Sequence, residues 1–163
     1  MNDAAKREGF FERGGGWVMA QFALMSAVAL GALVWRGQIK AGWLWGPGVA
    51  LLAAGAVFGV AGARALGKWR TPFPKPRPES RLVEHGIYAR VRHPLYTSVM
   101  LVSLGWALCW QSVAALVLAL AQVPFFLAKA RREERWLQEQ FPGYADYARR
   151  VPAFLPRWRR GGS

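Results

Sequence analysis

The chain has 163 residues, enough for one domain, and combines a hydrophobic content of 53% with nine tryptophans and a net charge of +13. Its single cysteine excludes an intramolecular disulfide and a cysteine metal cluster, and with only two histidines besides we expect no metal site. The charges fall in clumps between long uncharged runs, which indicates membrane topology and argues against a nucleic-acid partner.

The N-terminal half predicts two membrane spans. Residues 17–35 carry no charge, and their length is close to the ~20 residues that a helix needs to cross the hydrocarbon core. We expect this span to be retained, because no convincing small-residue cleavage site follows it. A second span is predicted over residues 42–64, and its GAVFG pattern from Gly55 to Gly59 would let another helix approach closely.

A basic loop over residues 65–93 follows. Its proline-rich first half should be extended and stiff rather than helical. Pro94 suits the first turn of the next helix, because it lacks the N–H that a helix start leaves unpaired, and His93 then falls near the N-cap. Arg90 and Arg92 add to the positive end of that helix dipole, so the sequence favours an anion such as a carboxylate or phosphate here.

The next uncharged run, residues 96–128, is too long for one span. As a single helix it would extend about 50 Å against a core of about 30 Å. We therefore predict two short spans, 94–109 and 112–129, joined by a tight hairpin near Cys109 to Ser112. The expected architecture is an all-α integral membrane bundle of about four transmembrane helices in a single domain, 1–163, with a cytoplasmic C-terminal helical segment over 130–163.

The distribution of lysine and arginine predicts the orientation. The N-terminal tail has three such residues, the stretch from Arg64 to Arg92 has eight and the segment from Lys129 onward has nine, whereas the first loop has two and the third none. Short loops rich in lysine and arginine stay in the cytoplasm. We therefore expect a multi-pass membrane protein with both termini and the loop over residues 65–93 on the cytoplasmic side.

An antiparallel hairpin should bring the cytoplasmic ends of the third and fourth spans together. His93 and Tyr96 lie at one end and the segment Lys129 to Glu134 at the other. A polar cluster at the entrance of a membrane helix is a functional candidate. Donors and aromatic rings would face the carboxylates of Glu133 and Glu134, which would complement a ligand carrying both an anion and a cation. S-adenosylmethionine is such a ligand, although the charge pattern does not single it out.

Three motifs follow one another between residues 81 and 156: "LVEHGIYARVRHPLY", "REER" and "FPGYADYARRVPAFLP". Together they resemble the membrane methyltransferases of the isoprenylcysteine carboxyl methyltransferase and phospholipid N-methyltransferase family. The resemblance implies a small all-helical enzyme that encloses S-adenosylmethionine between the Arg-His-Pro loop and the Glu-Glu helix. It also implies a C-terminal lid with Tyr144 and Tyr147, and a cofactor pocket lined by Tyr88, Arg92, His93, Pro94, Tyr96 and Glu134.

The implied reaction is direct displacement at the sulfonium carbon by a lipid-like acceptor, with no obligate protein partner evident. A carboxylate acceptor would need only a cationic clamp such as Arg131 or Arg92. An amine acceptor would need deprotonation, for which Glu134 could serve, with Glu133 beside it facing the cofactor or substrate. One position departs from the family, because Ser98 stands where a glycine is usual. We expect its side chain to narrow a close approach of the backbone to the cofactor.

Two alternatives stay open. Membrane sterol reductases, which use NADPH, look similar in this C-terminal region, but their chains are usually longer and have more spans. A non-catalytic membrane protein would use its arginines for topology alone, and Glu133 and Glu134 would then form ion pairs on a solvated helical face.

Overall fold

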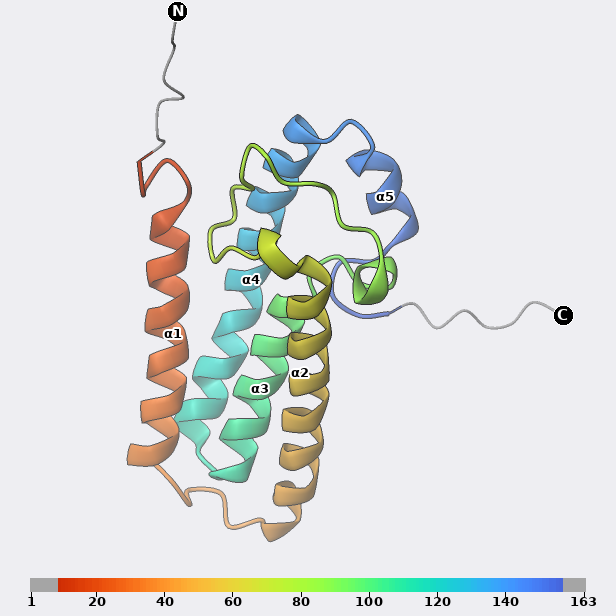
Figure 1. Ribbon diagram of the computed structural model, residues 1–163. Coiled ribbons are helices and arrows are strands. Elements are labelled where there is room, and N and C mark those ends of the chain that lie inside the picture. The colour runs from red at the N-terminus through yellow and green to blue at the C-terminus, as the bar shows by residue number, and fades with distance from the viewer. Residues whose placement is uncertain (1–8, 157–163) are drawn as a thin grey trace, which may run out of the picture.

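The computed structural model describes residues 9–156, and every regular element in that range is a helix (Figure 1). Four long helices run up and down, and a short fifth lies beyond the end of the fourth. Single 3-10 turns occupy Gly42–Leu44, Gly67–Trp69 and Gly86–Ala89. The helices are α1 (Gly15–Val34), α2 (Trp45–Leu66), α3 (Pro94–Cys109), α4 (Val113–Gln140) and α5 (Tyr144–Arg150).

Three of these helices are long and apolar enough to cross a membrane: α1, α2 with its flanking 3-10 turns, and α4. The fourth, α3, is apolar but has 16 residues, which corresponds to about 24 Å of helix. The predicted all-helical membrane bundle is confirmed, with α3 as its short member. The boundaries 17–35, 42–64, 94–109 and 112–129 stay predictions as membrane limits. The ends of the chain, residues 1–8 and 157–163, lie outside the described range.

Helix α3 lies between its neighbours, with α2 on one side and α4 on the other, and α1 packs against α4 and α3. Glycines bring α2 and α3 into backbone contact. A Cβ added to Gly55 would lie 2.7 Å from Cγ2 of Val102, and one added to Gly105 would lie 2.6 Å from the carbonyl oxygen of Gly48. The hydroxyl of Ser98 donates a hydrogen bond of 2.6 Å to the carbonyl oxygen of Gly55. The close approach predicted for the GAVFG pattern is therefore confirmed.

The predicted tight hairpin joins α3 to α4. Gln111 adopts a positive φ of 51° in the turn, and Ser112 caps the start of α4 by accepting a hydrogen bond from the Ala115 amide at 3.2 Å. The Ser112 hydroxyl in turn donates to the carbonyl oxygen of Gly31 on α1 at 3.2 Å. This end of the bundle holds a core of small side chains, which includes Ala107 and Ala115.

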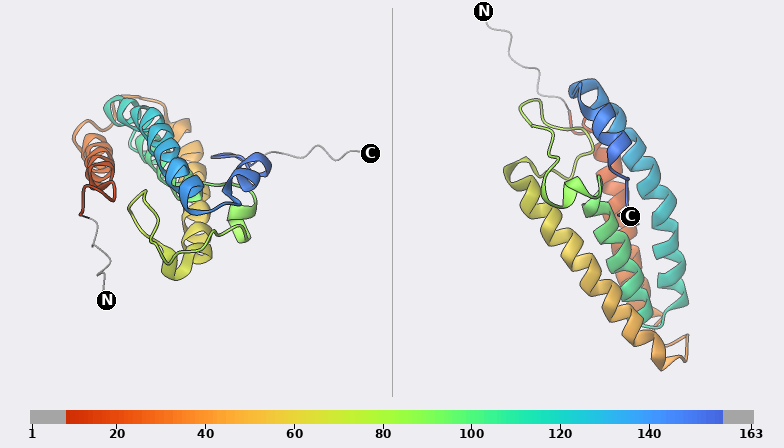
Figure 2. Two further views of the ribbon diagram at one scale, coloured as in Figure 1. Left: turned by 90° about the horizontal axis from the view of Figure 1, so that it is seen from above. Right: turned by 90° about the vertical axis from the view of Figure 1, so that its right-hand side faces the viewer.

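At the opposite end, α4 continues without a break to Gln140, and Glu133 and Glu134 lie level with the start of α3, where they contact Tyr96 and His93. The loop between α2 and α3 folds across this end, and α5 lies beside it (Figures 1 and 2). The chain then returns to the start of α3, where the amides of Arg92 and His93 donate hydrogen bonds of 2.9 Å to the carbonyl oxygens of Pro152 and Ala153. These contacts hold the Arg-His-Pro segment against the C-terminal segment.

Candidate functional site

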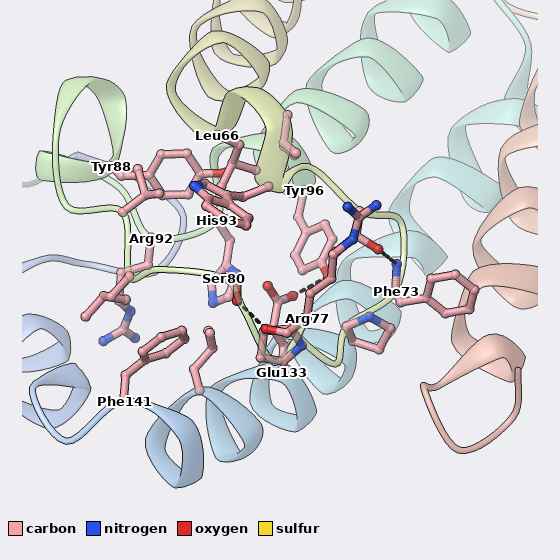
Figure 3. A pocket seen from close by; sticks show the side chains of 18 of the residues that line it. Leu66, Phe73, Arg77, Ser80, Tyr88, Arg92, His93, Tyr96, Glu133 and Phe141 are labelled. Carbon is pink, nitrogen blue, oxygen red and sulfur yellow. Dashed lines mark hydrogen bonds between the residues drawn. The ribbon is translucent and has the colours of Figure 1, made fainter. Parts of the chain in front are cut away.

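A cavity opens at the end of the bundle that carries α5, between the loop, the start of α3 and the last turns of α4 (Figure 3). It contains about 1080 Å³ of empty space, part of which is open to solvent. Small-molecule sites commonly combine apolar walls with a few polar groups. This cavity has that character, because aliphatic and aromatic side chains surround a small number of charged ones.

His93 sits at the centre of the polar contacts. Only 5% of the residue is exposed, and its Nε2 lies 2.8 Å from Oε1 of Glu134. A guanidinium nitrogen of Arg92 contacts the same carboxylate oxygen at 2.9 Å, and another donates to the carbonyl oxygen of Ala148 on α5 at 2.7 Å. One carboxylate on α4 therefore fixes both residues that precede α3. The expected meeting of the two helix ends is present.

Glu133 and Tyr96 form a second contact between the same helices. The Tyr96 hydroxyl donates a hydrogen bond to Oε2 of Glu133, and both side chains line the cavity (Figure 3). The His93 ring stacks on Tyr96 with centroids 5.4 Å apart and an interplanar angle of 7°. The carboxylate of Glu133 thus faces the cavity from a wall built of aromatic rings.

Tyrosines from the loop and α5 complete the wall. The Tyr147 hydroxyl donates a hydrogen bond of 2.7 Å to the carbonyl oxygen of Tyr88. Burial raises the pKa of Tyr88, Tyr144 and Tyr147 above the ordinary value of 10.0, and the nearby Glu134 carboxylate adds to the rise at Tyr144. All three side chains therefore remain neutral hydroxyls at physiological pH.

Two polar atoms beside the cavity have no hydrogen-bond partner within residues 9–156. They are Nε of Arg92 and the hydroxyl of Tyr144, which lies near the Glu134 carboxylate but outside the geometry of a normal hydrogen bond, and both are buried. Buried polar groups are nearly always paired, so an unpaired one calls for an explanation such as a bound ligand. Both side chains line the cavity, and a ligand with acceptor atoms would satisfy them.

The proline-rich loop supplies a wall that the sequence did not reveal. Phe73, Arg77 and Ser80 line the cavity from this loop, and the Gln140 amide of α4 donates to the carbonyl oxygen of Arg77 at 2.8 Å (Figure 3). Gln21 reaches the cavity from α1. From the sequence, the arginines of this loop indicate membrane topology and nothing more. For α1, the one polar signal in the sequence is Gln21, a glutamine within an uncharged apolar run.

The residues proposed from sequence fall into three groups. Pro94 is buried as the first residue of α3, and Glu134 stands behind the cavity wall, where it holds Arg92 and His93. Arg131 is exposed and does not line the cavity, and Ser98 faces α2 instead of narrowing the cofactor approach, because its hydroxyl is bonded to Gly55. The cavity itself is lined by Tyr88, Arg92, His93, Tyr96, Glu133, Tyr144 and Tyr147.

The chemistry of the site is that of paired opposite charges on an aromatic and aliphatic surface. Glu133 offers a carboxylate to a cation, while Arg92 offers an unpaired donor to an anion. Within the described range, no group of three or more histidine, cysteine, aspartate or glutamate side chains could hold a metal ion. The arrangement can bind an organic molecule that carries both charges.

Comparison with known proteins gives a family match over residues 45–143, which is described as phospholipid methyltransferase. The chain is 40% identical over 108 residues to the cobalt-zinc-cadmium resistance protein CzcN of Cupriavidus metallidurans, a match that covers 66% of the chain and 50% of that protein. It is 29% identical to protein-S-isoprenylcysteine O-methyltransferase B of Arabidopsis thaliana, over 70% of the chain and 60% of that protein.

A shorter match joins the chain to methanethiol S-methyltransferase 2 of Bradyrhizobium diazoefficiens, with 39% identity over 72 residues. It covers 44% of the chain and 27% of that protein. The chain thus spans about half to three fifths of the first two relatives and a smaller part of the third. The family match includes the cavity residues from Leu66 to Phe141.

Proposed function

Because the chain belongs to the phospholipid methyltransferase family, we propose that it transfers a methyl group from S-adenosylmethionine to a lipid-like acceptor at the cytoplasmic face of a membrane. The observation that carries this proposal is the cavity that Glu133 and Arg92 both line, with the buried Nε of Arg92 left without a hydrogen-bond partner. Two of the similar proteins are methyltransferases by name, which supports the same reaction class.

The residues present fit the cofactor. S-adenosylmethionine carries a carboxylate, an ammonium, a sulfonium and an adenosine. Arg92 and the Tyr144 hydroxyl would hold its carboxylate, and Glu133 would balance its positive charge. The rings of Tyr88 and Tyr96 would pack against its flat and cationic parts, since aromatic faces attract cations.

When bound, the cofactor would supply an electrophilic methyl group. The protein would hold the acceptor in line with that methyl group and exclude water from the two. Glu134 suits this role, because its carboxylate holds both Arg92 and His93 and so fixes the start of α3 relative to α4. Orientation and desolvation supply most of the acceleration available to a displacement of this kind. His93 and Glu134 are therefore proposed to position the cavity wall.

The acceptor would reach the site from the membrane. Gln21 of α1, Leu66 of α2 and Val99 of α3 line the cavity, and each belongs to a helix of the apolar bundle. A carboxylate acceptor would need a cationic side chain beside it. Arg92 lines the cavity and could supply that charge, whereas Arg131 does not line the cavity. An amine acceptor would need a base, whereas Glu134 stands behind the cavity wall and is held by Arg92 and His93.

Calorimetry with S-adenosylhomocysteine on the purified full chain tests the proposal. Wild type should bind, and His93→Ala and Glu134→Gln should each weaken binding about tenfold or more, since each leaves a buried polar partner unsatisfied. The chain offers matched controls: His85 is its other histidine and is exposed, and Glu139 is an exposed acid on the same helix. His85→Ala and Glu139→Gln should bind as wild type does.

Three outcomes would count against the proposal. Wild type that binds NADPH but not S-adenosylhomocysteine would indicate the reductase alternative. Wild type that binds neither would favour a non-catalytic membrane protein. Equal binding by the four variants would show that the cluster of Arg92, His93 and Glu134 does not shape the cofactor site.

A further inference from the structure

A short turn over residues 77–80 stands between the cavity and solvent. It is closed by the amide and the hydroxyl of Ser80, which donate to the carbonyl oxygen of Arg77 at 3.0 Å and 2.6 Å. Arg77 and Ser80 both line the cavity (Figure 3). Arg77, Pro78 and Glu79 are also exposed to solvent. The 77–80 turn is therefore an outer wall of the cavity, with ligand space on one side and solvent on the other.

Gln140, the last residue of α4, holds the 77–80 turn. Its amide nitrogen donates to the carbonyl oxygen of Arg77 at 2.8 Å and to that of Pro78 at 3.3 Å, and it lies 3.4 Å from the hydroxyl of Ser80. Carbonyl oxygens can only accept, so the nitrogen of the Gln140 carboxamide must face the turn. Gln140 is not among the residues that line the cavity. A substitution of Gln140 therefore changes the hold on the turn without removing a side chain from the cavity wall.

The prolines of this stretch explain why the turn depends on a donor from another element. Pro76 and Pro78 carry no N–H group, so the stretch offers its neighbours mainly carbonyl oxygens. Each proline also restricts the residue before it to extended conformations, which makes the stretch stiff. A stiff segment rich in acceptors is held best by a side chain that donates, and Gln140 supplies two N–H groups.

Firm apolar contacts lie on both sides of the turn. Before it, Pro74 is fully buried, and a Cβ added to Gly14 would lie 2.7 Å from Cγ of that proline. After it, Leu82 packs against the buried core that contains Tyr144. Because the stretch between these two contacts is stiff, the turn can move as one body once Gln140 releases it.

The contacts of Gln140 are suited to repeated breaking. A cofactor must pass the cavity wall in each turnover, whereas the wall must exclude water during the transfer. The two hydrogen bonds from Gln140 to carbonyl oxygens are exposed, so water can replace them at little cost. The contact between His93 and Glu134 is partly buried instead. The 77–80 turn is thus the part of the wall that opens with the smaller loss.

We propose that Gln140 is a positioning residue that holds the 77–80 turn across the cavity, and that release of the turn from Gln140 sets the rate at which the cofactor enters and leaves. The inference rests on the proposed methyl transfer and concerns exchange of the cofactor, not its chemistry. A weaker hold on the turn speeds association and dissociation together. A merely structural defect in the cavity speeds dissociation alone and weakens the affinity to match.

The association and dissociation rates of tritiated S-adenosylhomocysteine, measured on the full chain in nanodiscs, test the proposal. Gln140→Glu has nearly the same shape, but it loses the N–H donors and places a carboxylate oxygen against two carbonyl oxygens. Both rates should rise about tenfold, while Kd should change less than about threefold. Gln140→Lys keeps a donor and should return both rates to within about twofold of wild type.

Gln138 provides the matched control, because it is an exposed glutamine on the same helix. Gln138→Glu and Gln138→Lys make the same changes of charge and should leave both rates as they are in wild type. The opposite change fixes the turn in place. In a Cys109→Ser background, Ser80→Cys and Gln140→Cys are joined by a short bifunctional methanethiosulfonate reagent. Both rates should then fall about tenfold or more below those of the same protein after reduction of the cross-link.

Four results would overturn the inference while S-adenosylhomocysteine binding by wild type leaves the proposed function standing. They are unchanged rates in Gln140→Glu, faster dissociation without faster association, equal effects in Gln138→Glu, and rates that the cross-link does not alter. Failure of wild type to bind S-adenosylhomocysteine would reject the proposed function and this inference with it.

Discussion

Tyr144 and Tyr147 show how the site depends on single hydroxyl groups. Both lie in a small core at the end of the bundle with Val151, and 1% and 2% of their surfaces are exposed. Burial is the first cause of the raised pKa of each, so neither ionises where an exposed tyrosine would. The neutral hydroxyl of Tyr147 can then donate to the carbonyl oxygen of Tyr88.

These pKa shifts predict a loss of stability in alkali. Above the ordinary value of 10.0 the unfolded tyrosines lose their protons, while the folded ones keep them until a higher pH. The unfolded state then binds fewer protons, so stability falls as pH rises above about 10. Thermal unfolding in detergent from pH 8 to 11.5 should show this fall, and Tyr147→Phe should reduce it while costing about 1 kcal/mol at pH 8. If stability falls with rising pH as steeply in Tyr147→Phe as in the exposed control Lys40→Gln, the raised pKa of Tyr147 does not contribute to the alkaline loss of stability.

Among whole elements, the pairing of α2 with α3 positions the site most directly. Gly55 and Gly105 allow backbone contact along the two helices, and Ser98 adds a hydrogen bond between them. Close contact through small residues is a common means of association where lipid is as apolar as the side chains. His93 is the N-cap residue directly before α3, so the packing of α3 on α2 determines where the histidine meets α4.

Gly55→Leu should therefore destabilise the bundle. A Cβ at this position already meets Val102 at 2.7 Å, and overpacking of this kind costs about 1–3 kcal/mol. Gly46→Leu is the matched control on the same helix, because a Cβ there meets nothing within 4 Å. Thermal unfolding should separate the two variants, and S-adenosylhomocysteine affinity should fall only for Gly55→Leu. Equal stability of the two would show that α2 and α3 can separate freely.

The whole molecule is asymmetric along its length. The cavity, α5 and the loop lie at one end, and the α3–α4 hairpin with Cys109 lies at the other. The loop between α2 and α3 carries seven lysines and arginines, whereas the first loop carries two and the hairpin none. If the positive end stays in the cytoplasm, the cavity faces the cytoplasm as well.

Cysteine labelling tests this orientation, because Cys109 is the single native cysteine. In a Cys109→Ser background, His85→Cys in the loop should react with a membrane-impermeant maleimide only after cells are permeabilised. Lys40→Cys in the first loop should react in intact cells. The reverse pattern would place the cavity on the outer side and remove the support for a cytoplasmic reaction.

The sequence by itself determined the number and order of the apolar helices, the break near Cys109, and the meeting of His93 with the Glu133–Glu134 pair. These features depend on local composition, on Pro94 and on an antiparallel hairpin, all of which can be interpreted without knowing how helices rotate. Gly55 was also recognisable, because small residues four apart favour close packing.

Only the tertiary structure decided which face each helix turns toward the cavity. When the lipid-facing and protein-facing sides of a helix are both apolar, periodicity does not distinguish them, because the contrast on which the pattern depends is missing. For this reason the sequence did not predict the hydrogen bond between Gln21 and Lys129, or that Ser98 faces α2. It also did not predict that Arg131 is exposed while Arg77 lines the cavity. Those side chains are positioned by contacts between residues far apart in the chain, which packing alone establishes.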